Sequence, residues 1–143
     1  MDGRGVPLSI IVAGANRHDV KLLLPTLEAI VVERPVARPD APQHLCADAG
    51  YTGAPAHQTI VSQGYTPHVR SRGEEAQAKA YNPDHRARRW VVEVCHSWIN
   101  RFRKLLVRFE KTDRSYCALL MLACAFIAFR KAVTTGKSNI IYG

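Results

Sequence analysis

The order of short apolar segments along the chain restricts its fold more than any other feature. Three segments favour buried strands, because each is short, apolar and bounded by turn signals: residues 7–12, His44–Ala47 and residues 65–69. Helical patterns fill the intervals between them, and the chain is helical in pattern again from Arg86 onward. This alternation predicts an α/β fold, although three strands are few for 143 residues.

Two short helices are expected between these strands. The first follows His18 and begins with Asp19 as its N-cap, and Pro25 either kinks it or marks its first turn. The second covers residues 54–63 and ends at Gly64. The segments 34–42 and 71–84 are expected to be loops, because they contain prolines and few apolar residues.

Two longer helices are expected near the C-terminus. Between residues 86 and 109 apolar side chains recur at steps of three and four, which predicts one continuous amphipathic helix. Its apolar stripe is Val91, Cys95, Trp98, Phe102, Leu105 and Phe109. Residues 114–131 are apolar nearly all round, which predicts a buried helix. Their longest apolar run is shorter than the roughly 20 residues that span a bilayer, so we expect no membrane partner.

The net charge of +8 predicts a polyanionic partner such as DNA. Residues 86–114 hold nine Lys and Arg and three acids, and nine minus three leaves +6 of that charge. Five of these bases are candidate contacts to a nucleic-acid backbone: Arg89, Arg101, Arg103, Lys104 and Arg108. The alternative is an ordinary solvated helix face.

The cysteines favour a reducing, cytoplasmic compartment. None of the four belongs to a C-x-x-C pair, and all lie in apolar runs, which predicts buried free thiols rather than a zinc site. The N-terminus has no signal-peptide pattern. The histidines show no metal-binding spacing, so we expect them to be structural or exposed.

Two carboxylates are the candidates for chemistry. Asp48 follows the strand His44–Ala47, at the end where open α/β sheets place catalytic groups, although it can equally be a turn residue. Glu93 lies opposite the apolar stripe, on a helix face that also carries Arg89, Asn100 and Lys104. A surface ion pair with Arg89 is the alternative. If Asp48 and Glu93 converge, their oxygens suit Mg²⁺, but two-metal phosphodiester chemistry normally uses three or more carboxylates.

Four stretches resemble the DDE transposases of bacterial insertion sequences, specifically the insertion sequence five group. They are DGRGVPLSIIVAGANRHD, LCADAGYTG, RRWVVEVCHSWINRFRKLLVRFEK and YCALLMLACAFIAFRK. The resemblance implies a ribonuclease H-like catalytic domain over residues 1–133, followed by a flexible tail over 134–143. It also implies cutting and joining of DNA with two Mg²⁺ ions, and catalytic, metal-binding roles for Asp48 and Glu93.

The family's first catalytic aspartate would lie upstream of the segment that begins at Met1. The resemblance therefore implies a truncated fold with about three remaining strands and C-terminal helices, its first strand missing. We expect such a chain to be inactive alone, and to associate with itself or with an upstream transposase fragment. The alternatives are a basic DNA- or transposase-binding module without catalysis and a structural remnant without function. A bacterial, cytoplasmic and nucleoid-associated location follows from the same resemblance.

Overall fold

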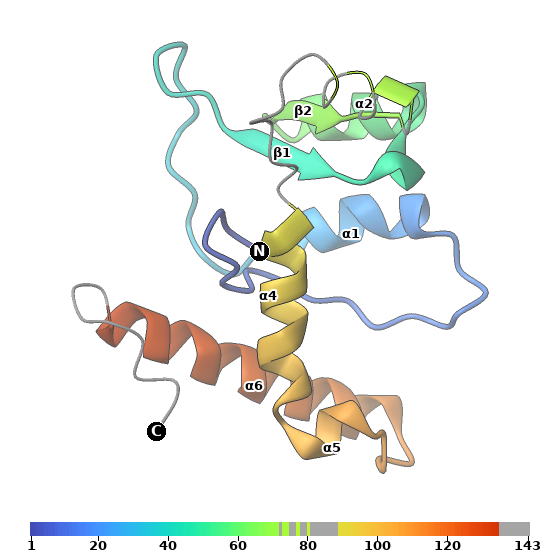
Figure 1. Cartoon of the computed structure of the whole chain (residues 1–143), viewed down its shortest axis with the longest axis vertical. Coiled ribbons are helices and arrows are strands. Elements are labelled where there is room, and N and C mark those ends of the chain that lie inside the picture. The colour runs from blue at the N-terminus through green and yellow to red at the C-terminus, as the bar shows by residue number, and fades with distance from the viewer. Residues whose placement is uncertain (72, 75–76, 78–79, 81–88, 135–143) are drawn as a thin grey trace. The chain divides into compact units, whose positions relative to one another are not determined.

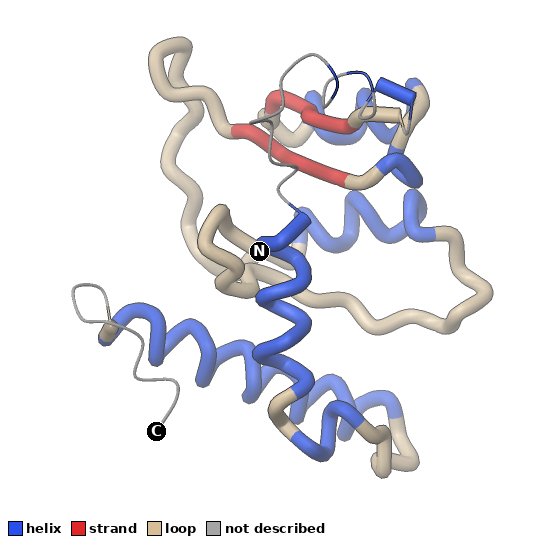
Figure 2. The backbone as a smooth tube through the Cα atoms, viewed as in Figure 1, coloured by secondary structure: helices blue, strands red, loops and turns tan. Residues whose placement is uncertain are grey.

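The computed structural model of this chain describes residues 1–71, 73–74, 77, 80 and 89–134. The chain divides into two compact units. The sheet unit is Ala13–Arg88, and the helical unit joins Met1–Val12 to the chain from Arg89 onward. Figure 1 labels the elements of both units, and Figure 2 separates their helices from their strands.

The sheet unit is built on two parallel strands joined by a crossover helix. Strand β1 (His44–Ala47) pairs with β2 (Thr66–Val69), and His44 lies opposite Thr66 in the register. Parallel strands need a connection long enough to return the chain to the same end, and α2 (Ala54–Ser62) provides it. The helix begins after Gly53, and Gly64 follows its end with a φ of 78°. Both strands, α2 and the loop over residues 34–42 confirm the expectations from sequence.

The core of the sheet unit lies on one face of the two strands. The 3₁₀ helix η1 (Asp19–Leu22) continues into α1 (Leu23–Glu28), whose first turn contains Pro25. Leu23 of α1 is buried with Ala56 and Ile60 of α2. Partly buried side chains complete this cluster: Val20, Leu27, Leu45, Tyr51, Tyr65 and Val69. The helices therefore exclude water from one face of the sheet.

The opposite sheet face is exposed and carries polar or thiol side chains. His44 and Cys46 of β1 and Thr66 and His68 of β2 alternate with the inward residues and are exposed. The Nδ1 atom of His44 lies 2.7 Å from Nε2 of His68. The expectation of a buried Cys46 is therefore wrong, because the strand places it on the outward side of the pleat.

The helical unit packs two short helices against a long one. It contains α4 (Arg89–Asn100), α5 (Arg103–Leu106) and α6 (Asp113–Val133). Leu105 of α5 is buried with Leu120 and Ala123 of α6. Partly buried side chains surround this cluster: Ile10, Ile99, Phe102, Tyr116 and Leu119. Thr112 caps α6, because its side chain accepts a hydrogen bond from the Ser115 amide at 3.2 Å.

A tight turn at the N-terminus docks on α4. One carboxylate oxygen of Asp2 accepts hydrogen bonds from the amides of Arg4 and Val6, both at 2.9 Å. Gly5 is buried in this turn with a φ of 84°, and a Cβ there would lie 3.3 Å from the carbonyl oxygen of Val91. Glycine is favoured at this position by both the backbone conformation and the close approach.

The expected strand over residues 7–12 is wrong. No part of this segment has strand pairing, and the sheet contains only β1 and β2 among the described residues. A strand requires a partner for its backbone groups, and neither of these two strands pairs with the segment. Ile10 instead packs against the cluster of Leu105, Leu120 and Ala123.

The single long helix expected over residues 86–109 is also wrong. Residues 86–88 lie outside the described part, and α4 ends at Asn100. Hydrogen bonds from the Arg101 amide to the Trp98 carbonyl and from the Phe102 amide to the Ile99 carbonyl tighten its last turn. Phe102 then takes an extended conformation, with φ −81° and ψ 99°. The break turns the chain, and the Phe102 ring packs edge-on against Phe126 of α6, with centroids 6.0 Å apart.

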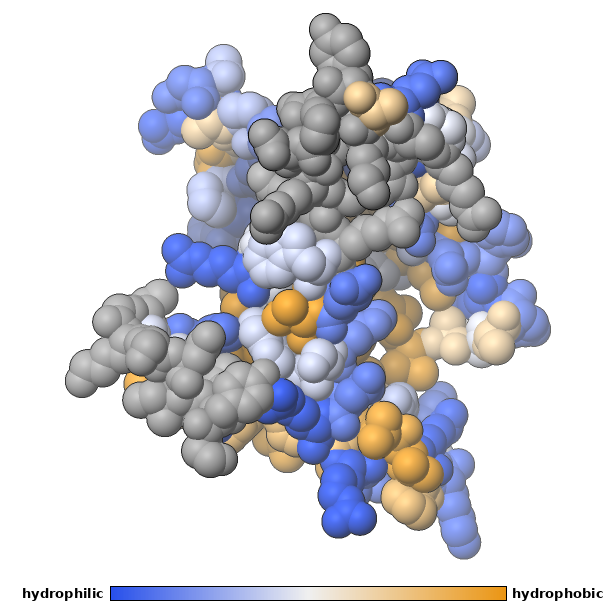
Figure 3. Space-filling view, in the orientation of Figure 1, coloured by the Kyte–Doolittle hydropathy of each residue, from blue (hydrophilic) through white to orange (hydrophobic). Residues whose placement is uncertain are grey.

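The break changes the predicted apolar stripe only at its end. Val91, Cys95 and Leu105 are buried, as their spacing predicts. Phe109 is 72% exposed, because it follows the end of α5. Figure 3 shows apolar side chains on the visible surface near α5 and the loop after it, where Leu106 and Val107 are also exposed.

The predicted loop over residues 71–84 is wrong at several described positions. Gly73, Glu74, Gln77 and Ala80 are helical, and the remaining residues of 72–84 lie outside the described part. Ser71 and Glu74 form a capping box, since the Ser71 amide donates to the Glu74 carboxylate and the Glu74 amide to the Ser71 hydroxyl. These hydrogen bonds lower the pKa of Glu74. Local capping by Ser71 therefore accounts for the helical conformation of Gly73 and Glu74.

The final helix has nearly the expected bounds but is not buried as expected. Only Leu120, Ala123 and Ile127 of α6 are buried, while Leu122 and Phe129 are each 67% exposed. In the described part of the chain, α6 alone is long and apolar enough to span a membrane, judged by length and composition only. Thr134 follows it, and the expected flexible tail beyond lies outside the described residues.

Replacement of Gly5 by alanine tests the docking of the N-terminal turn. We expect Gly5→Ala to lower the free energy of unfolding by about 1–2 kcal/mol, because alanine disfavours the positive φ and its Cβ crowds Val91. Chemical denaturation measures the change. Gly3→Ala is the matched control, since a Cβ there meets nothing within 4 Å. Equal effects of the two substitutions would contradict the described turn.

The cysteines offer a second test of the packing. Cys46 is exposed, whereas Cys95 is buried and its burial raises the pKa of its thiol. Since the thiolate is the reactive form, iodoacetamide should modify Cys46 well before Cys95 in the folded protein. Peptide mass spectrometry over a time course measures both rates, and equal rates in denaturant provide the control. Faster modification of Cys95 in the folded state would show that the packing of α4 is wrong.

Candidate active site

Asp48 stands directly after β1, as its position in the sequence predicts. It is the N-cap of the 3₁₀ helix η2 (Ala49–Tyr51), and its Oδ1 accepts a hydrogen bond from the Gly50 amide at 2.8 Å. A Cβ at Gly50 would lie 3.0 Å from this oxygen, so glycine permits the close turn. The turn role is thus confirmed, and the side chain is exposed at the carboxyl end of a parallel strand. A second role in binding a ligand stays a prediction.

The Tyr51 phenol lies within electrostatic range of both Asp48 and Asp19, the first residue of η1. Burial raises the pKa of the Tyr51 phenol, and the negative charges of Asp19 and Asp48 raise it further. The predicted N-cap role of Asp19 is wrong: His18 occupies the N-cap position of η1, and Asp19 is the first residue of the helix. Sequence reasoning did not single out Tyr51, although it follows Asp48 by three residues, within one turn.

Glu93 lies in the middle of α4 on its exposed side. Val91 and Cys95 face the packed side of the same helix, while Glu93 and Asn100 are exposed. The predicted opposition of Glu93 and the apolar stripe is therefore confirmed. Arg89 is the first residue of α4, but its side chain lies outside the described part. The alternative Arg89–Glu93 ion pair stays untested.

The two candidate carboxylates belong to different units. Asp48 is in the sheet unit, and Glu93 is in the helical unit. Their convergence on a metal ion therefore stays a prediction. Carboxylate oxygens are suitable ligands for a hard divalent cation. Within the described residues, however, no three His, Cys, Asp or Glu side chains form a group that could hold a metal ion.

Four of the five candidate DNA-contacting bases have described side chains, and all four are exposed: Arg101, Arg103, Lys104 and Arg108. Arg108 packs its guanidinium over the Tyr116 ring at 5.2 Å and donates to the Glu110 carbonyl at 3.4 Å. The predicted alignment of Lys104 with Glu93 on one helix face is wrong, because the chain turns after Asn100 and Lys104 belongs to α5. The bases around this turn still form an exposed basic segment.

Comparison with known proteins identifies the family. The profile described as the transposase DDE domain matches residues 1–127, so the chain belongs to this family. Proteins of this family are transposases, and they generally use divalent metal ions. The function of the family thus agrees with the exposed carboxylates and the basic segment.

A curated relative from Burkholderia cepacia is 34% identical over 133 residues. Its name is "Putative transposase for insertion sequence element IS402". The match covers 90% of this chain and 59% of the relative, so this chain spans less than two thirds of the relative's length. No solved structure matches the chain significantly.

The pKa of Tyr51 tests the placement of both aspartates. Asp48→Asn and Asp19→Asn should each lower the pKa toward its ordinary value of about 10, because each removes a negative charge that disfavours the phenolate. In the wild type, the contribution of Tyr51 to the free energy of unfolding is fully present below about pH 10. It is lost as the pH rises through the raised pKa of the folded state. A phenolate absorbance titration against a Tyr51→Phe reference measures the shift. An unchanged pKa in both variants, with Asp40→Asn as control, would refute this arrangement.

Proposed function

We propose that this chain is the C-terminal part of the catalytic domain of a DNA transposase of the insertion sequence five group, with a ribonuclease H-like fold. One observation carries the proposal. Asp48 directly follows the first strand of a parallel β1–α2–β2 unit, and the transposase DDE profile covers this unit. Open α/β sheets bind ligands at this end of their strands.

Asp48 and Glu93 are the proposed metal-binding residues. The bound Mg²⁺ ions would activate a water and stabilise the leaving oxygen when a phosphodiester bond is cut. The chain's own contribution is to hold two anionic oxygens, one in a tight turn and one on a regular helix. Since the chemistry normally uses three or more carboxylates, residues 1–143 alone should bind metal weakly and should not cleave DNA. We propose that an upstream transposase fragment supplies the first aspartate.

Arg89, Arg101, Arg103, Lys104 and Arg108 are the proposed contacts to DNA phosphates. They surround Glu93 along the sequence, and four of them have exposed side chains. Phosphate contacts from Arg and Lys position DNA without reading its sequence. A bacterial cytoplasm, in association with the nucleoid, is the proposed location for such a protein.

A basic DNA- or transposase-binding module without catalysis is the second candidate. The observation that favours it is the excess of six positive charges over residues 86–114, nine bases minus three acids. Such a module would bind DNA without any contribution from Asp48 or Glu93. The metal experiment below distinguishes the two candidates.

Binding of Mn²⁺, a paramagnetic substitute for Mg²⁺, tests the metal site directly. We expect millimolar Mn²⁺ to broaden the amide signals near Asp48 and Glu93 together, and Asp48→Asn or Glu93→Gln to remove most of the broadening at both places. Asp40→Asn and Glu33→Gln are matched controls on exposed acids of the sheet unit. Broadening that is absent, or that both substitutions leave unchanged, would leave only the DNA-binding module.

Salt-dependent DNA binding tests the basic segment. Replacing Arg101, Arg103 and Lys104 together by glutamine should reduce the slope of log K against log salt by about 1 for each phosphate that is no longer neutralised. Fluorescence anisotropy with duplex DNA at several salt concentrations measures this slope. The control replaces Arg17, Lys21 and Arg38, which are exposed and change the net charge equally. If both triple variants weaken binding alike, the DNA contacts are not concentrated after α4.

A further inference from the structure

The exposed face of the β1–β2 sheet brings two imidazole rings into contact. The Nδ1 atom of His44 lies 2.7 Å from Nε2 of His68, and the ring centroids are 4.8 Å apart. Both side chains are exposed, and the proposed transposase chemistry uses neither. The spacing of histidines along the chain does not reveal this pair, because the parallel register brings together residues that are 24 positions apart.

The backbone beneath the two rings is held on both strands. The carbonyl of Gln43, directly before His44, accepts a hydrogen bond from the Thr66 amide at 2.7 Å. Directly before β2, the Arg34 guanidinium lies 4.4 Å from the centre of the Tyr65 ring. The pairing of β1 with β2 fixes the register between these points. A ligand held by both rings would therefore bind to strands that are already ordered, which lowers the entropic cost of binding.

A contact of this length between two ring nitrogens requires a proton between them. In the neutral pair, one facing nitrogen donates its N–H and the other accepts with its lone pair. If that proton moves through water to the far nitrogen of its own ring, both facing nitrogens present lone pairs. Neutral imidazole binds metal ions in this form. A metal ion can thus replace the shared proton without a change in the number of protons on the pair.

The distance between the two nitrogens is close to what a zinc ion needs. Zn–N bonds of about 2.0–2.1 Å at a tetrahedral angle place two ligand nitrogens about 3.3 Å apart. The rings of His44 and His68 therefore need to separate by about 0.6 Å, which rotation about their side-chain bonds allows. Imidazole donors suit Zn²⁺, whereas Mg²⁺ prefers oxygen ligands.

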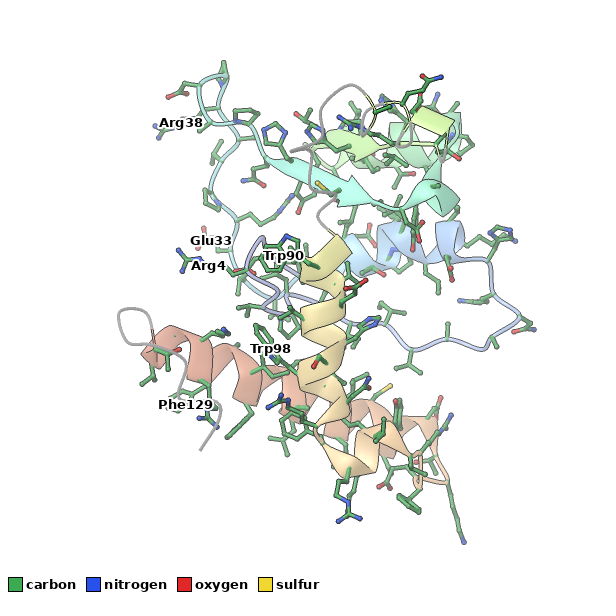
Figure 4. The ribbon with its side chains drawn as sticks, viewed as in Figure 1. Arg4, Glu33, Arg38, Trp90, Trp98 and Phe129 are labelled. Carbon is green, nitrogen blue, oxygen red and sulfur yellow. The ribbon has the colours of Figure 1, made fainter. Side chains whose placement is uncertain are left out.

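The surroundings of the pair supply no third protein ligand. Cys46 is exposed on the same sheet face and stands opposite His68 in the register. However, no third His, Cys, Asp or Glu joins the pair in a metal-binding group within the part of the chain that the structure describes. Figure 4 shows Arg38 at the tip of the loop before β1, pointing away from the strands. Water is therefore expected to complete the coordination of an ion held by the two rings.

We propose that Nδ1 of His44 and Nε2 of His68 bind a Zn²⁺ ion that clamps β1 to β2. His44 is the first residue of β1, so this zinc clamp and Asp48 lie at opposite ends of the strand. An ion that binds only the folded state stabilises it by mass action. Zinc should therefore stabilise the strand pair and, with it, the turn that positions Asp48. The clamp is distinct from the proposed Mg²⁺ site and does not depend on transposase activity.

Calorimetric titration of the full chain with zinc chloride tests the clamp. Excess Mg²⁺ in the buffer occupies sites made of hard oxygen ligands. We expect one Zn²⁺ per chain, and His44→Gln or His68→Gln should each lower the affinity by about tenfold or more. Zinc should also raise the unfolding temperature of the wild type but not of these two variants. His18→Gln with His57→Gln is the matched control at two exposed histidines of the sheet unit and should change neither result. Circular dichroism confirms that each variant folds.

NMR of the ring nitrogens distinguishes the clamp from loose zinc binding. In the zinc-loaded chain, His44 should carry its proton on Nε2 and His68 on Nδ1, because the proposed bonds use the other two nitrogens. The opposite tautomer on either ring, or no binding at millimolar zinc, would overturn the clamp. Binding that Cys46→Ser abolishes and His44→Gln leaves intact would also overturn it, since the exposed thiol would then be the ligand. These measurements use neither DNA nor cleavage, so their failure would leave the proposed function standing.

Discussion

Strands β1 and β2 can pair in parallel only because α2 returns the chain to the end of the sheet from which it started. This crossover fixes the direction of β1 and hence the end at which Asp48 emerges. The side chains of Leu23, Ala56 and Ile60 stabilise the arrangement by covering one sheet face. The turn after Asp48 depends on this packing as well, since Gly50 and the half-buried Tyr51 follow directly from the strand end. The candidate metal ligand is therefore positioned by packing that lies behind it.

One side of α6 holds the helical unit together. Leu120 and Ala123 of α6 pack with Leu105 of α5, and the ammonium of Lys131 lies against the Trp98 ring of α4. The exposed positions of α6 between residues 118 and 133 all carry apolar side chains. Binding of DNA by the basic segment around α5 would weaken as the salt concentration is raised.

The regular elements that could be predicted from sequence are those with strong local signals. The strand His44–Ala47, the helix before Gly64 and the helix that contains Leu120 were all predictable, since periodicity and helix-ending residues act within a few positions. The break at Phe102 was not predictable, because the 3.6-residue repeat continues across it and only contact with α6 favours the turn. The capping box of Ser71 and Glu74 was a readable signal that polar composition concealed. At the site, Asp48 and Glu93 were found as exposed carboxylates, whereas the neighbourhood of Tyr51, Asp19 and Asp48 arises from chain segments that sequence periodicity does not relate.

The sequence by itself determined membership of the transposase DDE domain family, the crossover unit that carries Asp48 and the basic segment around α5. These depend on residue identity and local spacing, which are present in the chain before it folds. Only the tertiary structure decided that residues 7–12 form no strand, that α4 and α5 are separate helices, and that one arc of α6 is buried and the other exposed. Each of these outcomes depends on which distant segments supply hydrogen bonds or apolar contacts. The hydrophobic effect is non-directional, so the identity of an apolar side chain does not specify which surface it packs against.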